Sequence, residues 1–205
     1  MYITPKAIPA TKVLGGSIAI WENAWVEPSE TIKALEKNIK ESSNLDWQKA
    51  QTIADYEGLS NPTQRTNSIF HLRQNAKDNE VLRKISNDYF DLVASATDWY
   101  VQNFGIEEYI YFPEEFNVLR YQTGEEYNAH YDGGSQTKRV ISPILYLNED
   151  YEGGELEFVN YNIKIKPKAG MFFIFPANFA FRHVAHPVKT GTKYAIVTWL
   201  HDAAN

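Results

Sequence analysis

Two histidines and one aspartate stand at spacings that would let them hold a metal ion. His130 and Asp132 are separated by one residue, and His183 lies further along the chain. In an extended segment, residues i and i+2 point to the same face, so the His130 imidazole and the Asp132 carboxylate can converge on one ion. Two imidazoles and one carboxylate can occupy one face of an octahedral ion and leave three positions open, as in non-haem Fe(II) centres. The competing interpretation of His130 and Asp132 is a partly exposed turn, because two glycines follow directly.

A lysine stands ten residues after His183, where a buried cation would need a partner. Lys193 follows the Thr190-Gly191 turn and precedes the apolar run Tyr194-Ala-Ile-Val197. A cation inside a barrel is costly without an anionic group beside it, so this position predicts an anionic ligand. The competing interpretation of Lys193 is a solvated residue at a turn.

The segment before residue 105 is predicted to be mainly helical. Apolar residues at offsets of three and four predict helices over Glu30–Lys40 and about Asn79–Asn103. Ser29 is expected to cap the start of the first helix, and Gly105 the end of the second. Between the two helices, Gln51–Leu72 is polar and irregular.

After residue 105 the pattern changes to short strands separated by turn signals. The predicted strands are Phe116–Tyr121, Val140–Leu147, Glu155–Val159, Ile163–Lys166, Met171–Phe175 and Tyr194–His201, with Ser17–Trp21 as a further strand near the start. Many short strands with regular turns indicate a sandwich or jelly roll rather than a parallel sheet. The expected fold class is mainly β with α buttresses: a double-stranded β-helix (jelly roll) with the N-terminal helices packed on one sheet. We expect a single domain over residues 1–205, with a helical support region at about 22–105 and a jelly-roll core at about 110–202.

The composition is that of a globular chain and excludes several classes of protein. The chain has 205 residues, 43% of them hydrophobic, and no cysteine, which excludes disulfide frameworks, iron–sulfur clusters and thiol nucleophiles. Its net charge of −6 disfavours binding to nucleic acid or to anionic membranes. No apolar run approaches the roughly 20 residues of a membrane-spanning helix, and the N-terminus lacks the layout of a signal peptide. We therefore expect a cytoplasmic protein.

The strand region resembles the iron- and 2-oxoglutarate-dependent dioxygenases, and among them the prolyl 4-hydroxylases. The resemblance starts from the His-x-Asp pair, the distal histidine and the basic residue ten positions on. Leu119–Asp132 is similar to the prolyl 4-hydroxylase segment in which a tyrosine, a glycine and a second tyrosine lead into His-x-Asp. Ile144–Asn148, Gly153–Phe158 and Lys168–Phe175 resemble the strand and turn elements that follow in that subfamily.

The resemblance implies a role for each matched residue. The implied Fe(II) ligands are His130, Asp132 and His183. Lys193 would pair with the distal carboxylate of 2-oxoglutarate, and the hydroxyl of Tyr146 would donate to the same carboxylate, with Tyr121 near the metal and the cosubstrate. The implied apolar lining is Ile144, Leu156, Val197 and Trp199. Core packing is the competing interpretation for each aromatic residue, and for Trp199 and Leu156 the two readings carry equal weight.

Three further histidines match nothing in the motif. Strand alternation puts His186 on the face opposite to His183. We therefore expect His186 to be a surface residue, or a residue that contacts the ligands, rather than a ligand itself. His71 and His201 are expected to be structural.

The implied activity is hydroxylation of a peptidyl proline, with O2 consumed, succinate and CO2 released, and ascorbate as reductant. The candidate substrate residues are Arg65, Tyr127, Tyr131 and Arg182, and Gln51–Leu72 is a candidate lid. One alternative keeps the chemistry but changes the substrate to another amino-acid side chain, a free amino acid or a small metabolite. A second alternative is a non-catalytic jelly-roll binding module, against which the complete ligand set argues. The expected partner is a proline-containing peptide or protein; no nucleic acid or membrane is expected, and the sequence leaves the oligomeric state open.

Overall fold

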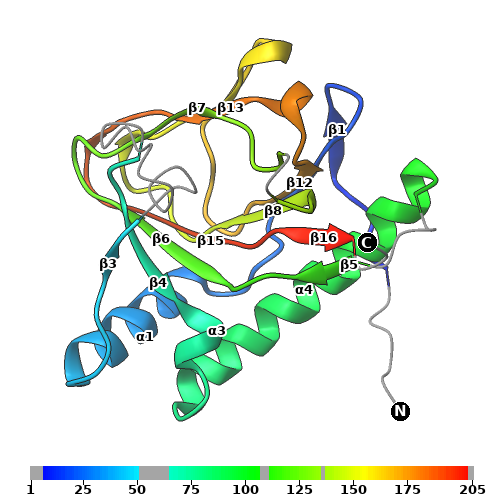
Figure 1. Ribbon diagram of the computed structural model, residues 1–205. Helices are drawn as coiled ribbons and strands as arrows, with labels where there is room; N and C mark the ends of the chain where they lie inside the picture. Colours follow the sequence, from blue (N-terminus) through cyan, green and yellow to red (C-terminus); the bar gives the residue numbers. More distant parts are fainter. Residues whose placement is uncertain (1–6, 51–64, 107–110, 135–136, 203–205) are drawn as a thin grey trace, which may run out of the picture.

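The computed structural model describes residues 7–50, 65–106, 111–134 and 137–202, and everything below concerns those residues. The helices are α1 (Pro28–Glu41), α3 (Leu72–Asn75) and α4 (Glu80–Phe104), with short 3-10 helices η1 (Val159–Tyr161) and η2 (Phe179–Phe181). Figure 1 shows α1, α3 and α4 gathered on one side of the strands. The N-terminal helices therefore act as supports for a β-structure, as the sequence predicts.

The larger sheet has ten antiparallel strands among the described residues. Eight of them follow one another in the order β1 (Lys12–Leu14), β2 (Ile18–Trp21), β12 (Phe172–Pro176), β8 (Arg139–Tyr146), β15 (Lys193–Val197), β6 (Asn117–Tyr121), β4 (Ser68–His71) and β3 (Gln48–Lys49). The remaining two are β16 (Leu200–Asp202), which pairs with β8, and β5 (Tyr111–Pro113), which pairs with β16.

The smaller sheet faces the larger one and carries both candidate ligand histidines. Its order is β11 (Ile163–Ile165), β10 (Leu156–Phe158), β13 (His183–Ala185) and β7 (Tyr127–His130). A separate antiparallel pair joins β9 (Glu152–Gly153) to β14 (Val188–Thr190). Two facing antiparallel sheets with helices outside confirm the predicted jelly roll with α buttresses.

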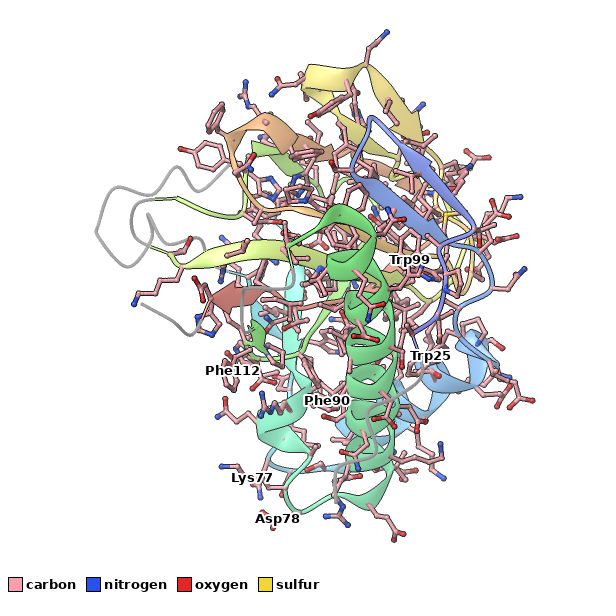
Figure 2. The ribbon with its side chains drawn as sticks, turned by 90° about the vertical axis from the view of Figure 1, so that its right-hand side faces the viewer. Trp25, Lys77, Asp78, Phe90, Trp99 and Phe112 are labelled. Carbon is pink, nitrogen blue, oxygen red and sulfur yellow. The ribbon has the colours of Figure 1, made fainter. Side chains whose placement is uncertain are left out.

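The larger sheet is buried on both faces because it lies between the helices and the smaller sheet. On β12, Phe172 and Ile174 pack with the helices, whereas Phe173 and Phe175 point to the space between the sheets. This alternation follows from the two-residue repeat of a strand, and burial on both sides explains why the strand reads as a continuous apolar run. Figure 2, turned to face α4, shows Trp99 beside the β1–β2 hairpin, where its ring packs edge-on against Trp21 at 5.6 Å.

The long helix matches its sequence signals, but the first helix starts differently from the prediction. Asn79 accepts a hydrogen bond from the backbone of Leu82, and Gly105 closes α4 in the left-handed conformation with φ +65°. Ser29 is not the cap of α1: the cap position is Glu27, and no side chain caps it. The reason is Pro28, which occupies the first helical turn and draws Ser29 into the helix.

The predicted strand Tyr194–His201 is two strands, β15 and β16. Opposite the break stands Pro143 of β8, which has no N–H to donate, although its carbonyl accepts from Thr198. The hydroxyl of Tyr89 in α4 also donates to the carbonyls of Pro143 and Ile196 at 3.3 and 3.1 Å. The helix is thereby hydrogen-bonded to the sheet where its ladder is interrupted.

The polar segment Gln51–Leu72 is only partly an irregular loop. Residues 51–64 lie outside the described residues. The remainder contradicts the prediction of irregular structure, since β4 pairs with β6 and Leu72 begins α3. Buried Ile69 and Phe70 provide the apolar contacts that favour a strand here.

Candidate active site

The two candidate ligand histidines lie on neighbouring strands. In the register of β7 and β13, His130 stands directly opposite His183, and their rings are 4.3 Å apart between centroids. Asp132 follows β7 two residues after His130, so its side chain returns to the same face. The sequence spacing of one residue, and the pairing of two distant strands, together bring the three side chains to one place.

The donor atoms of these residues suit a metal ion. Ligand atoms of His130, Asp132 and His183 all lie within 4.8 Å of one another. The carboxylate oxygens of Asp132 lie 3.5 Å from Nε2 of His130 and 3.8 Å from Nε2 of His183. All three side chains are nearly buried, at 9%, 5% and 5% exposure. Two imidazoles and one carboxylate are the donor set of non-haem Fe(II) oxygenase centres, so the residues present fit the implied metal.

Hydrogen bonds hold both imidazoles in the orientation that metal binding requires. Nδ1 of His130 lies 2.7 Å from the carbonyl oxygen of Asn128, and Nδ1 of His183 lies 3.0 Å from that of Phe181. A carbonyl only accepts, so each Nδ1 carries the proton and each Nε2 keeps its lone pair. Nε2 is the atom that faces Asp132 in both rings. Such outer contacts fix the tautomer of a ligating histidine.

The protonation states agree with this arrangement. Burial, and next the neighbouring His130, lower the pKa of His183 to about 4, so its imidazole is neutral at neutral pH. Burial alone would raise the pKa of Asp132, but His183, His130 and the hydroxyl of Ser142 hold it well below its usual range. Neutral imidazoles and an ionised carboxylate are the forms that bind metal ions.

Ser142 is a site residue that the sequence analysis missed. It is fully buried in β8, and its hydroxyl donates to Oδ2 of Asp132 at 2.6 Å. The one available signal was a hydroxyl residue inside an otherwise apolar strand. Its role depends on β8 passing behind the turn that carries Asp132, which local sequence patterns do not reveal.

Lys193 is buried rather than solvated at a turn. It is 1% exposed, and its Nζ donates to the carbonyl of Gly154 at 2.7 Å. The rings of Tyr121 and Tyr146 lie 5.1 and 5.2 Å from the same Nζ. Within the described part of the chain, no carboxylate lies at ion-pair distance from Lys193. Burial, and next the positive charge of Lys166, therefore lower the pKa of Lys193 to about 7.

Gly154 is required where it accepts this hydrogen bond. Its φ is +64°, in the left-handed region, and an added Cβ would lie 2.8 Å from Cε2 of Tyr151 and 3.2 Å from Cδ of Lys193. The second glycine of the Gly153-Gly154 pair thus lets the backbone approach the lysine closely.

One cavity is lined by both the metal-ligand group and Lys193. Its polar lining includes the His-Asp-His cluster and Lys193, together with Tyr121 and Tyr146. Its apolar wall consists of Leu119, Ile144, Leu156, Ala185, Ala195, Val197 and Trp199. All four residues predicted to line the site are in this wall. Trp199 lies under the guanidinium of Arg139 at 3.7 Å, and its buried Nε1 has no hydrogen-bond partner.

Two of the four candidate substrate residues line this cavity, and two do not. Tyr127 stacks on the His130 ring with centroids 3.5 Å apart, and the Arg65 guanidinium lies 4.7 Å over the Tyr127 ring. Tyr131 and Arg182 instead line a shallow pocket next to the cavity. His130 lines both spaces, so the two pockets share this one imidazole as a wall.

The other histidines lie outside the metal-ligand group. Nε2 of His186 is 2.6 Å from a carboxylate oxygen of Glu157, on the outer side of the smaller sheet. Nδ1 of His71 pairs with the side chain of Asn117 at 2.9 Å, and His201 is a half-buried residue of β16. The geometry agrees with the expectation that His186 is not a ligand.

Comparison with known protein families identifies the class to which this site belongs. Residues 116–201 match the family model of the 2OG-Fe(II) oxygenase superfamily, where 2OG is 2-oxoglutarate. This segment contains the three candidate metal ligands, Ser142 and Lys193. The match covers 86 of the 205 residues, and over this segment the chain is similar to the 2OG-Fe(II) oxygenases.

The curated proteins that are similar in sequence include prolyl and lysyl hydroxylases. A probable prolyl 4-hydroxylase 9 from Arabidopsis thaliana is 30% identical over 118 residues, which cover 43% of this chain and 41% of the relative. A procollagen-lysine,2-oxoglutarate 5-dioxygenase 2 from Homo sapiens is 29% identical over 105 residues, covering 50% of this chain and 13% of the relative. The chain spans less than half the length of these curated relatives. Over the matched segment, the chain is similar to 2OG-Fe(II) oxygenases of the prolyl 4-hydroxylase-like type.

Solved structures share the fold over most of the chain. A prolyl hydroxylase from Trichoplax adhaerens, in complex with a hypoxia inducible factor peptide fragment, superposes with a TM-score of 0.72 at 19% identity, covering 92% of this chain and 84% of that one. A viral collagen prolyl hydroxylase from Paramecium Bursaria Chlorella virus-1, in complex with 2OG, gives 0.61 at 22% identity, covering 92% and 98%. At these identities the likeness establishes the fold. Separately, among the described helices none has the length and apolar character needed to cross a membrane.

Proposed function

We propose that this protein is an Fe(II)- and 2-oxoglutarate-dependent dioxygenase that hydroxylates a peptidyl proline. The observation that carries the proposal is that two groups line one cavity. His130, Asp132 and His183 present two free Nε2 atoms and an ionised carboxylate. Lys193 is a buried cation with a carbonyl as its hydrogen-bond partner. A dicarboxylate that bound the metal through one end would supply the anionic partner of Lys193 through the other.

When bound, Fe(II) and 2-oxoglutarate would supply the oxidation of a C–H bond by O2, with succinate and CO2 as the other products. The residues of this chain bind and orient the reactants. Lys193, with Tyr146 next to it, would hold the distal carboxylate, and Tyr121 would lie beside the cosubstrate. The apolar wall that includes Ile144 and Leu156 excludes water from the reacting atoms. Ascorbate as reductant stays a prediction.

Proline is the proposed target because several of the similar proteins are named prolyl hydroxylases. An extended proline-containing peptide suits an aromatic-lined site, because its polyproline II conformation loses little entropy on binding. Tyr127 and Trp199 provide aromatic rings at the cavity, and the guanidinium of Arg65 lies over the Tyr127 ring. These rings would pack against the pyrrolidine ring of the substrate. A lid within residues 51–64 also stays a prediction.

A lysyl side chain is the second candidate substrate. It is favoured by the similarity to the procollagen-lysine dioxygenases, whose matching segment covers half of this chain. The chemistry would be the same, and only the groups that hold the target side chain would differ.

The deciding experiment incubates the full chain with Fe(II), 2-oxoglutarate, ascorbate and matched peptides that contain proline, lysine or neither. We expect succinate formation to be stimulated by the proline peptides, with one oxygen gained at proline by tandem mass spectrometry. Oxygen gained at lysine instead would replace the proline assignment with the second candidate. No succinate with any peptide, free amino acid or lysate fraction would favour a non-catalytic binding module.

A further inference from the structure

A shallow pocket beside the cavity offers a place for the parts of a substrate that do not react. It is lined by Ala129, His130, Tyr131, Phe179 and Arg182. Because the imidazole of His130 also lines the inner cavity, a chain leaving the cavity past His130 enters this pocket. The pocket therefore lies where residues flanking a reacting side chain would lie.

Two aromatic rings in this pocket are exposed, and hydrogen bonds anchor the turn that carries one of them. Phe179 is 76% exposed and Tyr131 is 51% exposed. The amide of Asn160 donates to the carbonyls of Phe179 and Ala180 at 3.2 and 2.9 Å, and Asn178 accepts from the backbone of Ala180 at 3.0 Å. An exposed ring on an anchored turn can bind a partner at little cost in conformational entropy. Phe179, which the sequence analysis did not single out, is such a ring.

The one charged group of this pocket that faces solvent is an arginine. Arg182 is exposed, it lies between η2 and the ligand His183, and no carboxylate lies at ion-pair distance among the described residues. A guanidinium binds a carboxylate through two parallel hydrogen bonds. The chain as a whole carries a charge of −6, whereas Arg182 provides local attraction for an anionic group at this pocket.

We propose that Tyr131, Phe179 and Arg182 form a subsite that selects extended peptides with a carboxylate side chain close to the reacting residue. The inference rests on the proposed function and adds the class of peptide that the enzyme prefers. An extended peptide advances about 3.3 Å per residue, and Arg182 is the neighbour of a ligand residue, so the carboxylate belongs roughly two or three residues from the reacting one. A neutral peptide would use the aromatic rings alone, and this alternative is an outcome of the test.

The test compares peptides that differ in one side chain. Each peptide has a single proline in a glycine-serine background, with Glu, Gln or Lys placed two or three residues before or after it. The measured quantity is kcat/KM, from succinate release and from the oxygen gained at proline. In at least one placement we expect the Glu peptide to exceed the Gln peptide by about three- to tenfold, as for a partly exposed ion pair, and the excess to shrink at high salt.

Variants assign the preference to the subsite. Arg182→Glu should reverse the preference towards the Lys peptide. Arg83→Glu makes the same change of charge on α4, at an exposed position outside both pockets, and should leave the preference as it is in the unaltered protein. Phe179→Ala should raise KM for all peptides by a similar factor without changing the charge preference, because the ring contacts the peptide backbone and apolar groups.

Equal turnover of Glu and Gln peptides in all placements would overturn the proposal, as would equal shifts of the preference in Arg182→Glu and Arg83→Glu. Fluorescence anisotropy with fluorescein-labelled Glu and Gln peptides separates this failure from failure of the proposed function. Tighter binding of the Glu peptide that Arg182→Glu abolishes, without oxygen gained at proline, would retain the subsite and reject proline as the substrate. Equal binding of both peptides would reject the subsite.

Discussion

The chemistry of the site depends first on which nitrogen of each imidazole is free. The carbonyls of Asn128 and Phe181 accept from the Nδ1 atoms, and so the Nε2 atoms of His130 and His183 are directed to Asp132. Each carbonyl lies two residues before its histidine, so the tautomer is set by the local chain itself. Single residues can therefore be changed here with predictable effects on metal binding.

Asp132→Asn should lower the affinity for a divalent metal by more than about tenfold. The reason is that a charged oxygen ligand contributes at least as much as a charge-assisted hydrogen bond, about 1.5–3 kcal/mol. Titration calorimetry with Mn(II), a probe that does not oxidise readily, measures the affinity, and circular dichroism checks the fold. His186→Ala is the matched control and should bind Mn(II) as the unaltered protein does. Equal affinity in Asp132→Asn would remove this residue from the ligand set.

Lys193→Ala should raise the KM for 2-oxoglutarate by roughly ten- to a hundredfold. The distal carboxylate would lose a charged donor worth about 1.5–3 kcal/mol. Tyr146→Phe should act in the same direction more weakly, since it removes a neutral donor. Steady-state kinetics measure the change, with Lys168→Ala, an exposed lysine, as the control. An unchanged KM in both site variants would mean that the carboxylate binds elsewhere.

At the scale of elements, the strands bring the chemistry together and the turns adjust it. Strand β15 carries Lys193 opposite Tyr121 on β6. The turn after β9 carries the carbonyl of Gly154, which accepts a hydrogen bond from Lys193. This turn can therefore be tested separately from the strands.

Gly154→Ala should destabilise the fold more than Gly124→Ala. Both glycines have positive φ, +64° and +88°, but a Cβ at Gly154 meets Tyr151 and Lys193, whereas one at Gly124 meets nothing within 4 Å. The backbone change costs roughly 1–2 kcal/mol at either site, and overpacking adds roughly 1–3 kcal/mol at Gly154 alone. Urea unfolding measures the difference in the free energy of unfolding. Equal losses would contradict the close approach of this turn to Lys193.

At the scale of the whole molecule, the buried lysine links stability to pH. The pKa of Lys193 is about 7 in the fold against an ordinary value of 10.5, so between these values the unfolded chain binds a proton that the folded chain does not. Stability then rises with pH across this window. Below pH 7 both states are protonated, and the fold bears the full cost of the buried charge.

Lys193→Met should therefore be more stable than the unaltered protein at pH 6, with a margin that shrinks as the pH rises from about 7 towards 10.5. Thermal and urea unfolding without metal or cosubstrate, over this pH range, measure the margin. Lys168→Met serves as the control for other titrating groups and should show no such trend. A margin that does not change with pH would show that Lys193 titrates normally.

Much of the site was predictable because its signals are local. The spacing of His130 and Asp132, the lysine ten residues after His183 and the glycine turns are properties of short segments, where backbone geometry relates spacing to direction. The helix α4 was predictable in the same way, from a repeated apolar stripe with Asn79 before it and Gly105 after it. The sequence alone thus determined the fold class and pointed to the three candidate ligands and the lysine that line one cavity.

The tertiary structure decided the contacts between distant segments. That the hydroxyl of Ser142 reaches Asp132, that Pro143 and Tyr89 divide the last strand, and that Phe179 stands exposed beside Arg182 all depend on how the sheets and helices pack. The physical reason is the distance along the chain over which each signal acts. A spacing or a repeat of apolar residues involves only a few neighbouring residues. The contacts named above arise only when strand pairing and burial bring together residues far apart along the chain.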